Sequence, residues 1–248
     1  MVNQLAKRVL LTTITLYVIG LAISVGFTFI YLQFQNLIIF PIIFLIAYAF
    51  AYSMPFWFML FTRAKSYHGK YLDKLLFFAS KMELPLKEIY IRKNKMSNAM
   101  AMGFGNTRSV LFHSNLIEKS SWQEIEGVMA HELGHHYNKD IFIYTLIIAS
   151  AISAVVLFDT FLYSLFSEQI NLFYINLVNS FLVFEVVLFL IRWRESLADK
   201  YAKEILENPM GLVKFLQGLK VPSKFSWLYL LFIYHPWPTD RVKMLKGK

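Results

Sequence analysis

Residues 131–166 read HELGHHYNKDIFIYTLIIASAISAVVLFDTFLYSLF. The first five place His131 and His135 four positions apart, so on a helix both imidazoles lie on one face and can bind a single metal ion. Glu132 between them is placed to take a proton from an attacking water. From Ile141 onward the stretch is apolar and long enough to cross about 30 Å of hydrocarbon. It therefore predicts a metal-binding helix that leads directly into a membrane span.

The rest of the chain is also too apolar for an ordinary soluble domain. Of its 248 residues, 57% are hydrophobic and 17% are aromatic. Four runs without Lys or Arg are long enough to span a bilayer: Val9 to Leu32, Leu37 to Phe61, Ile141 to Phe166 and Ile170 to Ile191. The first run is longer than a usual signal core and lacks a clear cleavage site, so we expect a retained span.

The basic residues predict the orientation of these spans. Of 25 Lys and Arg residues, two precede the first span, twelve lie from Arg63 to Lys139, and eleven lie from Arg192 onward. The short connections at 33–36 and 167–169 contain none. The positive-inside rule then places both termini and the HExxH segment in the cytoplasm of a multi-pass protein of the inner or plasma membrane. The net charge of +9 follows from this topology and from attraction to the anionic lipid bilayer, so we expect no nucleic-acid partner.

These observations predict a mainly α integral membrane protein with four transmembrane helices and a cytoplasmic catalytic domain. Residues 1–61 would form an N-terminal hairpin with spans at about 9–32 and 37–61. Residues 141–191 would form a second hairpin with spans at about 141–166 and 170–191. The segments 62–140 and 192–248 then lie on one side of the membrane, and together they have the size of one small domain.

Local patterns predict the elements of that domain. Residues 71–82 have the apolar spacing of an amphipathic helix. Strands are expected at 88–92 and 108–113, with a turn at 103–106 between them. Ser121 begins a helix with Glu124 three residues on, which is a capping box. The predicted buried side of that helix comprises Ile125, Val128, Met129 and Leu133.

A catalytic zinc site usually has three protein ligands and an open position, so one ligand is missing. The chain contains no cysteine, which leaves His or a carboxylate. Two spans after His135 return the chain to the same side, where Glu195 is our predicted ligand. Asp199 lies one turn further along the same helical face, suited to accept a hydrogen bond from a ligating histidine. The alternative is a solvated helical face on which these acids pair with Arg194 and Lys203.

Four motifs in order resemble those of the HtpX-like membrane zinc metalloproteases, which are related to the type I CAAX prenyl proteases. They are HELGH followed by Asn138 and Asp140, RWRESLAD at 192–199, SNAMAMG at 97–103, and His235-Pro236 with Arg241. Together with two spans before the catalytic region and two inside it, these motifs cover nearly the whole chain. The sequence departs from the family pattern where Trp237 and then Pro238 follow His-Pro, instead of a second proline.

The resemblance implies a gluzincin-type catalytic domain with a small β-sheet and one Zn²⁺ per chain. The zinc ligands would be His131, His135 and Glu195, with Glu132 as the general base. Asp140, Asp199 and Arg241 would support the ligands.

The same resemblance implies residues that contact the substrate. Asn98, Ala99 and Ala101 would lie on an edge strand beside the substrate backbone, and His235 would lie beside the transition-state oxygen. The alternatives are that Asn98 is only a turn residue and that His235 is a structural histidine in a Tyr-His-Pro-Trp turn.

The predicted function is zinc-dependent endopeptidase cleavage of membrane or membrane-associated proteins at the cytoplasmic face, in membrane protein quality control. One alternative is a prenyl-peptide protease, although that family has more spans. Another is a signalling membrane protease, although no extracellular sensor domain is evident. A non-enzymatic alternative is an inactive scaffold or chaperone, which the intact Glu132 disfavours.

Two acids lie inside predicted spans, where ionisable residues are rare. Asp159 is expected near the far interface and accessible to water. Glu185 lies about 9 Å inside the cytoplasmic end of its span, where a hydrogen-bonded packing role competes with a functional one.

Overall fold

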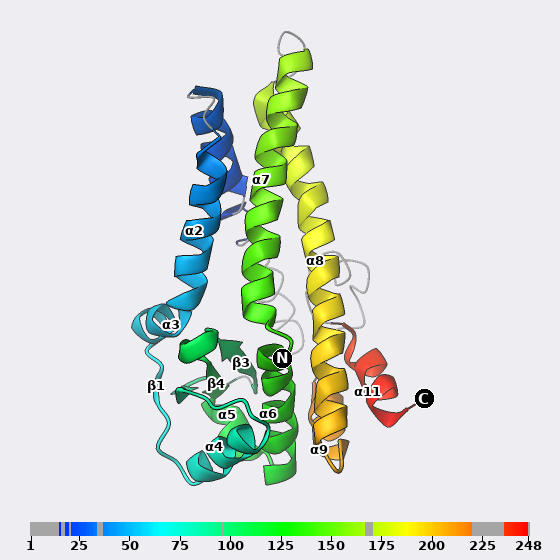
Figure 1. The fold of residues 1–248 in the computed structure, drawn as a ribbon. Helices are drawn as coiled ribbons and strands as arrows, with labels where there is room; N and C mark the ends of the chain where they lie inside the picture. Colours follow the sequence, from blue (N-terminus) through cyan, green and yellow to red (C-terminus); the bar gives the residue numbers. More distant parts are fainter. Residues whose placement is uncertain are drawn as a thin grey trace. The chain divides into compact units, whose positions relative to one another are not determined.

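The computed structural model describes residues 15, 18, 19, 21–33, 37–95, 97–166, 171–219 and 236–247. They divide into two compact units (Figure 1). The described residues of the first unit come from 15–48 and 144–192, and those of the second come from 49–143, 193–219 and 236–247. Each unit is therefore assembled from pieces that lie far apart in the sequence.

The first unit is built from apolar helices. It contains the helix Leu21–Gln33, most of α2 (Ile39–Tyr52), and the greater part of α7 (Asp140–Phe166) and α8 (Leu172–Ile205). Both α7 and α8 are long and apolar enough to cross a membrane, in agreement with two of the predicted spans. Helix α8 continues past Ile191 and enters the second unit as an unbroken helix.

The other two predicted spans differ from expectation or remain predictions. The run 37–61 is two helices, α2 and α3 (Met54–Thr62), with a break at Ser53. Pro55 lies in the first turn of α3, where its ring and missing N–H oppose continuation of the preceding helix. Within the run 9–32 the structure describes residues 15, 18 and 19 and the helix Leu21–Gln33, and the other residues of the run lie outside the described part. The described residues thus support two spans, or three if the bent pair crosses as one.

A buried polar cluster connects three helices of the first unit. The carboxylate of Asp159 on α7 is fully buried and accepts hydrogen bonds from the amides of Asn176 and Asn179 on α8, the latter at 2.6 Å. Ser24 Oγ, on the helix Leu21–Gln33, lies 3.2 Å from Asn176 Oδ1 and 3.2 Å from Ser180 Oγ. The expectation of a wet Asp159 is therefore wrong, because α8 supplies amide donors that replace water.

The second unit contains a four-stranded sheet with the order β1-β2-β4-β3. Strands β1 (Lys65–Ser66) and β2 (Glu88–Arg92) pair antiparallel, β2 and β4 (Ser109–His113) parallel, and β4 and β3 (Ala99–Met102) antiparallel. Both strands predicted from local pattern are present, and β3 lies at the edge of the sheet.

Helices complete the second unit. They are α4 (Leu72–Lys81), α5 (Ser114–Lys119), α6 (Trp122–Tyr137), α9 (Met210–Gly218) and α11 (Pro238–Lys246), with a 3₁₀ turn η1 at Gly105–Thr107. Helix α6 begins at Ser121, and the capping box with Glu124 forms as predicted. The four predicted core residues of α6 are buried, and the helix packs against α9.

Candidate active site and metal centre

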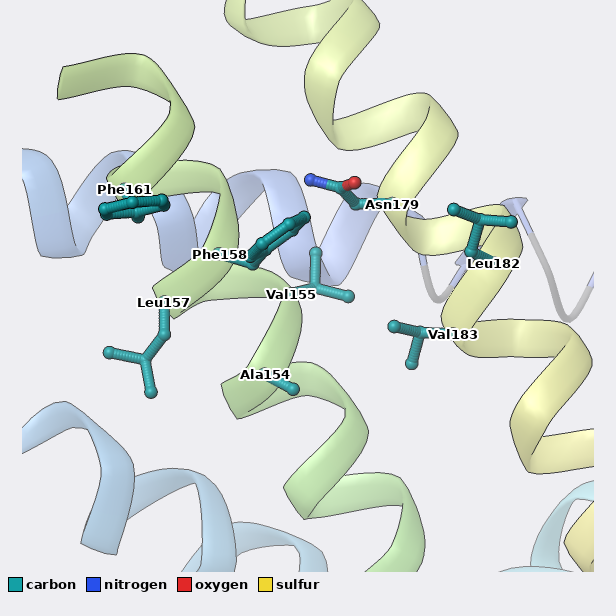
Figure 2. Close-up of a pocket in the computed structure, with 8 residues that line it drawn as sticks. All are labelled: Ala154, Val155, Leu157, Phe158, Phe161, Asn179, Leu182 and Val183. Carbon is teal, nitrogen blue, oxygen red and sulfur yellow. The ribbon is translucent and has the colours of Figure 1, made fainter. Parts of the chain in front are cut away.

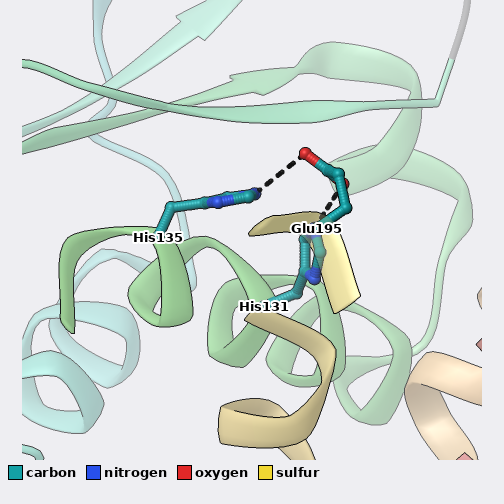
Figure 3. A group of neighbouring side chains, drawn as sticks. All are labelled: His131, His135 and Glu195. Atoms are coloured by element: carbon teal, nitrogen blue, oxygen red, sulfur yellow. Dashed lines mark ion pairs between the residues drawn. The ribbon is translucent and has the colours of Figure 1, made fainter. Parts of the chain in front are cut away.

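Helix α6 and helix α8 bring three potential metal ligands together (Figure 3). Nε2 of His131 lies 3.5 Å from one carboxylate oxygen of Glu195, and Nε2 of His135 lies 3.4 Å from the other. All three side chains are buried. The spacing of four residues on α6 presents both rings on one face, and the unbroken course of α8 supplies the carboxylate.

The two histidine-to-carboxylate separations are close to those of a tetrahedral zinc site, and one ligand atom from each of the three residues lies within 4.8 Å of the others. Ligand atoms at about 2.0–2.1 Å from zinc in a tetrahedron are about 3.3–3.4 Å from one another. Two imidazole nitrogens and one carboxylate oxygen are also the donor set of many catalytic zinc sites, in which the fourth position is open. The chemistry and the spacing of these donors therefore suit the predicted cofactor.

The Nδ1 atom of His135 faces a carboxylate. It lies 2.8 Å from Asp140 Oδ2, at the start of α7, and the guanidinium of Arg194 pairs with the same carboxylate. A carboxylate at Nδ1 fixes the tautomer whose Nε2 lone pair is free for a metal. The sequence suggested Asp140 as a support, but it gave no signal for Arg194 beyond its place in the 192–199 motif.

His131 has an equivalent partner. Its Nδ1 lies 2.8 Å from Asp199 Oδ1, and Arg241 of α11 binds both oxygens of Asp199, at 2.6 and 2.7 Å. Burial alone would disfavour the charge on Asp199, but Arg241 and His131 outweigh it and hold the pKa of this carboxyl well below its usual range. Glu195 and Asp199 are both buried, so the alternative of a solvated helical face is wrong.

The charges around His131 favour a cation at its ring. Burial and Arg241 oppose protonation of the imidazole, yet Asp199 and Glu195 overcome both and raise the pKa of His131 to about 10. A metal ion held by His131 would supply the positive charge that these carboxylates favour, in place of the proton.

Glu132 faces the open edge of the sheet. The backbone N–H of Ala101 in β3 donates a 2.6 Å hydrogen bond to Glu132 Oε2. The N–H of His113 donates to the carbonyl of Asn98, so at residue 98 the backbone groups point toward β4. Because backbone groups alternate in an antiparallel pair, those of Ala99 and Ala101 point away from β4. An extended peptide could therefore pair with β3 beside Glu132.

Two glycines allow these elements to approach closely. A Cβ on Gly134 of α6 would lie 2.8 Å from the Cα of Ala198 on α8, so the helix crossing requires a residue without a side chain. Gly103 follows β3 with φ of +66°, a left-handed conformation that glycine adopts without strain. The motif glycines thus fix how α8 and β3 meet the site.

A family profile described as Peptidase family M48 matches residues 69–248, a range that includes every site residue described above. The chain belongs to peptidase family M48. Membership confirms the resemblance to HtpX-like membrane zinc metalloproteases that the four motifs indicate.

Curated relatives of this M48 chain agree with that assignment. A protein named Protease HtpX homolog from Caldanaerobacter subterraneus subsp. tengcongensis is 27% identical over 199 residues, which cover 66% of this chain and 67% of the relative. Another of that name, from Limosilactobacillus reuteri, is 32% identical over 160 residues, which cover 57% of this chain and 54% of the relative.

A solved structure shares the fold. The crystal structure of S. mikatae Ste24p superposes with a TM-score of 0.67 at 20% sequence identity, covering 95% of this chain. The chain spans 66% of the Ste24p chain, slightly less than two thirds of its length.

A third histidine of α6, for which the sequence predicts an ordinary surface or core role, contacts the sheet of the M48 chain. His136 is buried on α6, and its Nε2 lies 3.1 Å from the backbone carbonyl oxygen of Ser109 in β4. Burial lowers the pKa of His136 to about 4, so the ring is neutral and donates its Nε2–H to that carbonyl. No spacing in the sequence pairs His136 with Ser109, because the contact forms only when α6 packs on the sheet.

The remaining predicted residues are placed less closely or lie outside the described part. Asn98 is exposed and directly precedes β3. His235 lies outside the described residues. A pocket in the first unit, between α7 and α8, is lined by apolar side chains and Asn179 (Figure 2), so it offers no set of groups for hydrolysis.

Proposed function

We propose that this M48 chain is a zinc-dependent endopeptidase that hydrolyses membrane or membrane-associated proteins at the cytoplasmic face of the membrane. The observation that supports this best is one arrangement. His131, His135 and Glu195 offer three buried ligand atoms within 4.8 Å of one another, and Glu132 accepts a hydrogen bond from the open edge strand β3.

The residues divide the chemistry among them. When bound, zinc would polarise the scissile carbonyl and make a water easier to deprotonate. The Ala101 N–H holds one oxygen of Glu132, which leaves the other oxygen to accept a proton from the attacking water. Glu132 can then return this proton to the leaving amine. The outward backbone groups of Ala99 and the carbonyl of Ala101 would hold the substrate as an added strand, which requires little sequence preference.

Two further features of the proposal come from sequence. The positive-inside rule favours a cytoplasmic site. Glu195 is four residues beyond Ile191 on the continuous helix α8, a rise of about 6 Å, which favours a metal centre at headgroup level. The HtpX names of the relatives are compatible with a role in membrane protein quality control.

We retain His235 as the proposed donor to the transition-state oxygen. Loss of such a donor typically lowers the rate about 100- to 1,000-fold. The His235→Ala variant should therefore keep its metal, and its cleavage rate should fall by about this factor. An unchanged rate would assign the residue a structural role.

The decisive test combines metal analysis with cleavage of casein. Wild-type protein should contain one zinc ion per chain and cut casein, and Glu132→Gln should keep the zinc without cutting. Glu132→Gln conserves the shape of the side chain, and retained zinc in this variant would also show that it is folded. Equal cleavage by both proteins would point to a contaminating protease, and zinc-free wild type would remove the metal assignment.

A further inference from the structure

Helix α3 of the second unit is apolar on all sides, and only one side is covered within the described chain. Met54 and Met59 pack on a cluster formed by Ala64, Tyr90, Met102 and Leu111, and Pro55 is buried. The opposite side, which we call the outer face, comprises Phe56, Trp57, Leu60 and Phe61. The side chains of Phe56, Leu60 and Phe61 are 57%, 59% and 75% exposed. A helix that is apolar all round is normally enclosed by protein or by lipid.

The length of the preceding helix indicates lipid. Helix α2 has 14 residues, about 21 Å at 1.5 Å per residue, which is shorter than a hydrocarbon core of about 30 Å. Neither α2 nor α3 alone is long enough to span a bilayer, and the two are long and apolar enough only when taken together. The chain that leaves α2 is therefore still apolar where α3 begins.

The end of α3 has the residues expected at a membrane surface. Trp57 donates to Ser53 Oγ and stacks on Phe61, which places an aromatic pair on the outer face. Arg63 and Lys65 follow directly and are exposed. No acidic residue occurs from 53 to 66. Aromatic side chains favour the interface, and basic ones are attracted to anionic headgroups.

We infer that the outer face of α3 docks into the interfacial layer of an anionic phospholipid bilayer, so that α3 lies in the membrane surface and does not extend a span. The occupant is lipid, because the face combines bulky apolar side chains with two cations and no acids.

Docking would also position the substrate-binding edge. Besides the methionine contacts to Met102, Thr107 Oγ1 donates to the carbonyl of Tyr52 at 3.1 Å, and the rings of Tyr52 and Phe104 lie 5.5 Å apart. Helix α3 is thus joined to β3, and the end of α2 just before it is joined to the turn that follows β3. This step rests on the proposed function: membrane-anchored segments would reach β3 near the membrane surface, and they would be cleaved faster than the same segments in solution.

The absence of cysteine permits a direct depth measurement. Single variants Leu60→Cys and Phe61→Cys would carry one nitroxide each in full-length protein, reconstituted in phosphatidylethanolamine and phosphatidylglycerol vesicles. Phe77→Cys on α4 is the matched control, since Phe77 is 71% exposed in the same unit. Collision with oxygen and with a water-soluble nickel chelate then reports depth. We expect both α3 labels about 5–10 Å below the headgroup boundary and the Phe77 label in water.

Two results would overturn the inference. Labels on α3 that the nickel chelate reaches as readily as the Phe77 label would place the outer face in water. Labels that neither reagent reaches would show that protein covers it, either another part of the chain or a second copy. The accessibility of the labels does not depend on catalysis, so this result can be distinguished from a failure of the proposed function.

A cleavage comparison tests the link to substrate. Leu60→Ser with Phe61→Ser should lower cleavage of a membrane-anchored segment several-fold and leave cleavage of the same soluble peptide unchanged. Phe77→Ser should change neither. An equal loss on both substrates, or none on either, would contradict the positioning role of α3.

Discussion

Each unit buries a polar cluster around carboxylates, and the two clusters are built from different partners. In the second unit, Asp199 and Asp140 are matched by arginines and by ligand histidines. In the first unit, the partners of Asp159 in the described residues are the neutral amides of Asn176 and Asn179.

The difference indicates what each cluster can hold. Paired charges around His131 and His135 keep the ring nitrogens oriented and favour a cation between them. Two amides satisfy one buried carboxylate, and the hydroxyls of Ser24 and Ser180 extend the network to a third helix, but these groups present no set of ligands like that of the second unit. The first cluster is thus suited to joining helices, and the second to chemistry.

The largest predicted effect separates the two clusters by metal content. Glu195→Ala removes one of three ligands and should lose zinc, because the remaining two histidines leave the site incomplete. Asp159→Leu should retain one zinc per chain. Elemental analysis of both proteins checks this. Stoichiometric zinc in the Glu195 variant would refute its assignment, and loss of zinc from the Asp159 variant would abolish the distinction.

The next effect concerns the support of the ligands. Asp199→Asn cannot hold His131 with a full charge and leaves Arg241 without its ion partner, so zinc affinity should fall about 10- to 100-fold. Competition with a zinc chelator measures this. Lys243→Gln on the same helix α11 has an exposed side chain and serves as the control. An affinity equal to that of wild type would show that Asp199 supports the fold alone.

The polar cluster around Asp159 in the first unit should contribute to the stability of the protein. Asp159→Leu leaves two amides without their acceptor inside apolar helices, and interhelical hydrogen bonds in membranes are worth about 0.6 kcal/mol on average, at most about 1.7. We expect the free energy of unfolding in detergent to fall by about 1–2 kcal/mol. Asp159→Asn keeps an acceptor and should lose less. If both variants were as stable as wild type, the network would contribute nothing.

A smaller effect should appear at His136, which joins α6 to the sheet. Its contact with Ser109 sets the position of β4 and thereby of β3 relative to Glu132. His136→Leu should keep zinc and raise KM several-fold with a smaller change in kcat, because substrate binding depends on the edge. His136→Gln, which can still donate, should restore part of the loss. A fall in kcat alone would argue against positioning.

The smallest effect belongs to the partly exposed capping box at Ser121. Burial opposes ionisation of Glu124, but the hydrogen bonds from Ser121 and the charge of Lys214 together outweigh it and lower its pKa. The folded state thus favours the carboxylate, so this stabilisation is present above the unfolded pKa of about 4.3 and is lost as the pH falls further. Glu124→Gln keeps a capping-box side chain and loses only the charge at the helix N-terminus, so it should cost about 0.3–1 kcal/mol at pH 7 and less near pH 4. A cost that did not shrink in acid would exclude the charge as its source.

Much of this protein follows from local pattern. The spacing of His131 and His135, the capping box, the strands at 88–92 and 108–113, and the apolar lengths of α7 and α8 are all properties of short segments. Periodicity and length report such features because they depend on neighbouring residues. Glu195 was also predicted from sequence, on the expectation that two spans return the chain to the same side, and the structure places it beside both histidines.

Other features depend on contacts between distant segments, which no local pattern encodes. The pairing of Arg194 with Asp140, the bond from Ala101 to Glu132 and the link between His136 and Ser109 each join residues at least 27 positions apart. The sequence predicted that Asp159 is hydrated near the end of a span, whereas in the structure two amides of α8 donate hydrogen bonds to it. The break at Ser53 was hidden because both sides of it are apolar. The sequence determined which groups are available and which segments are helical, and only the tertiary structure decided which buried polar groups meet, because burial makes each of them require a partner that chain packing alone can provide.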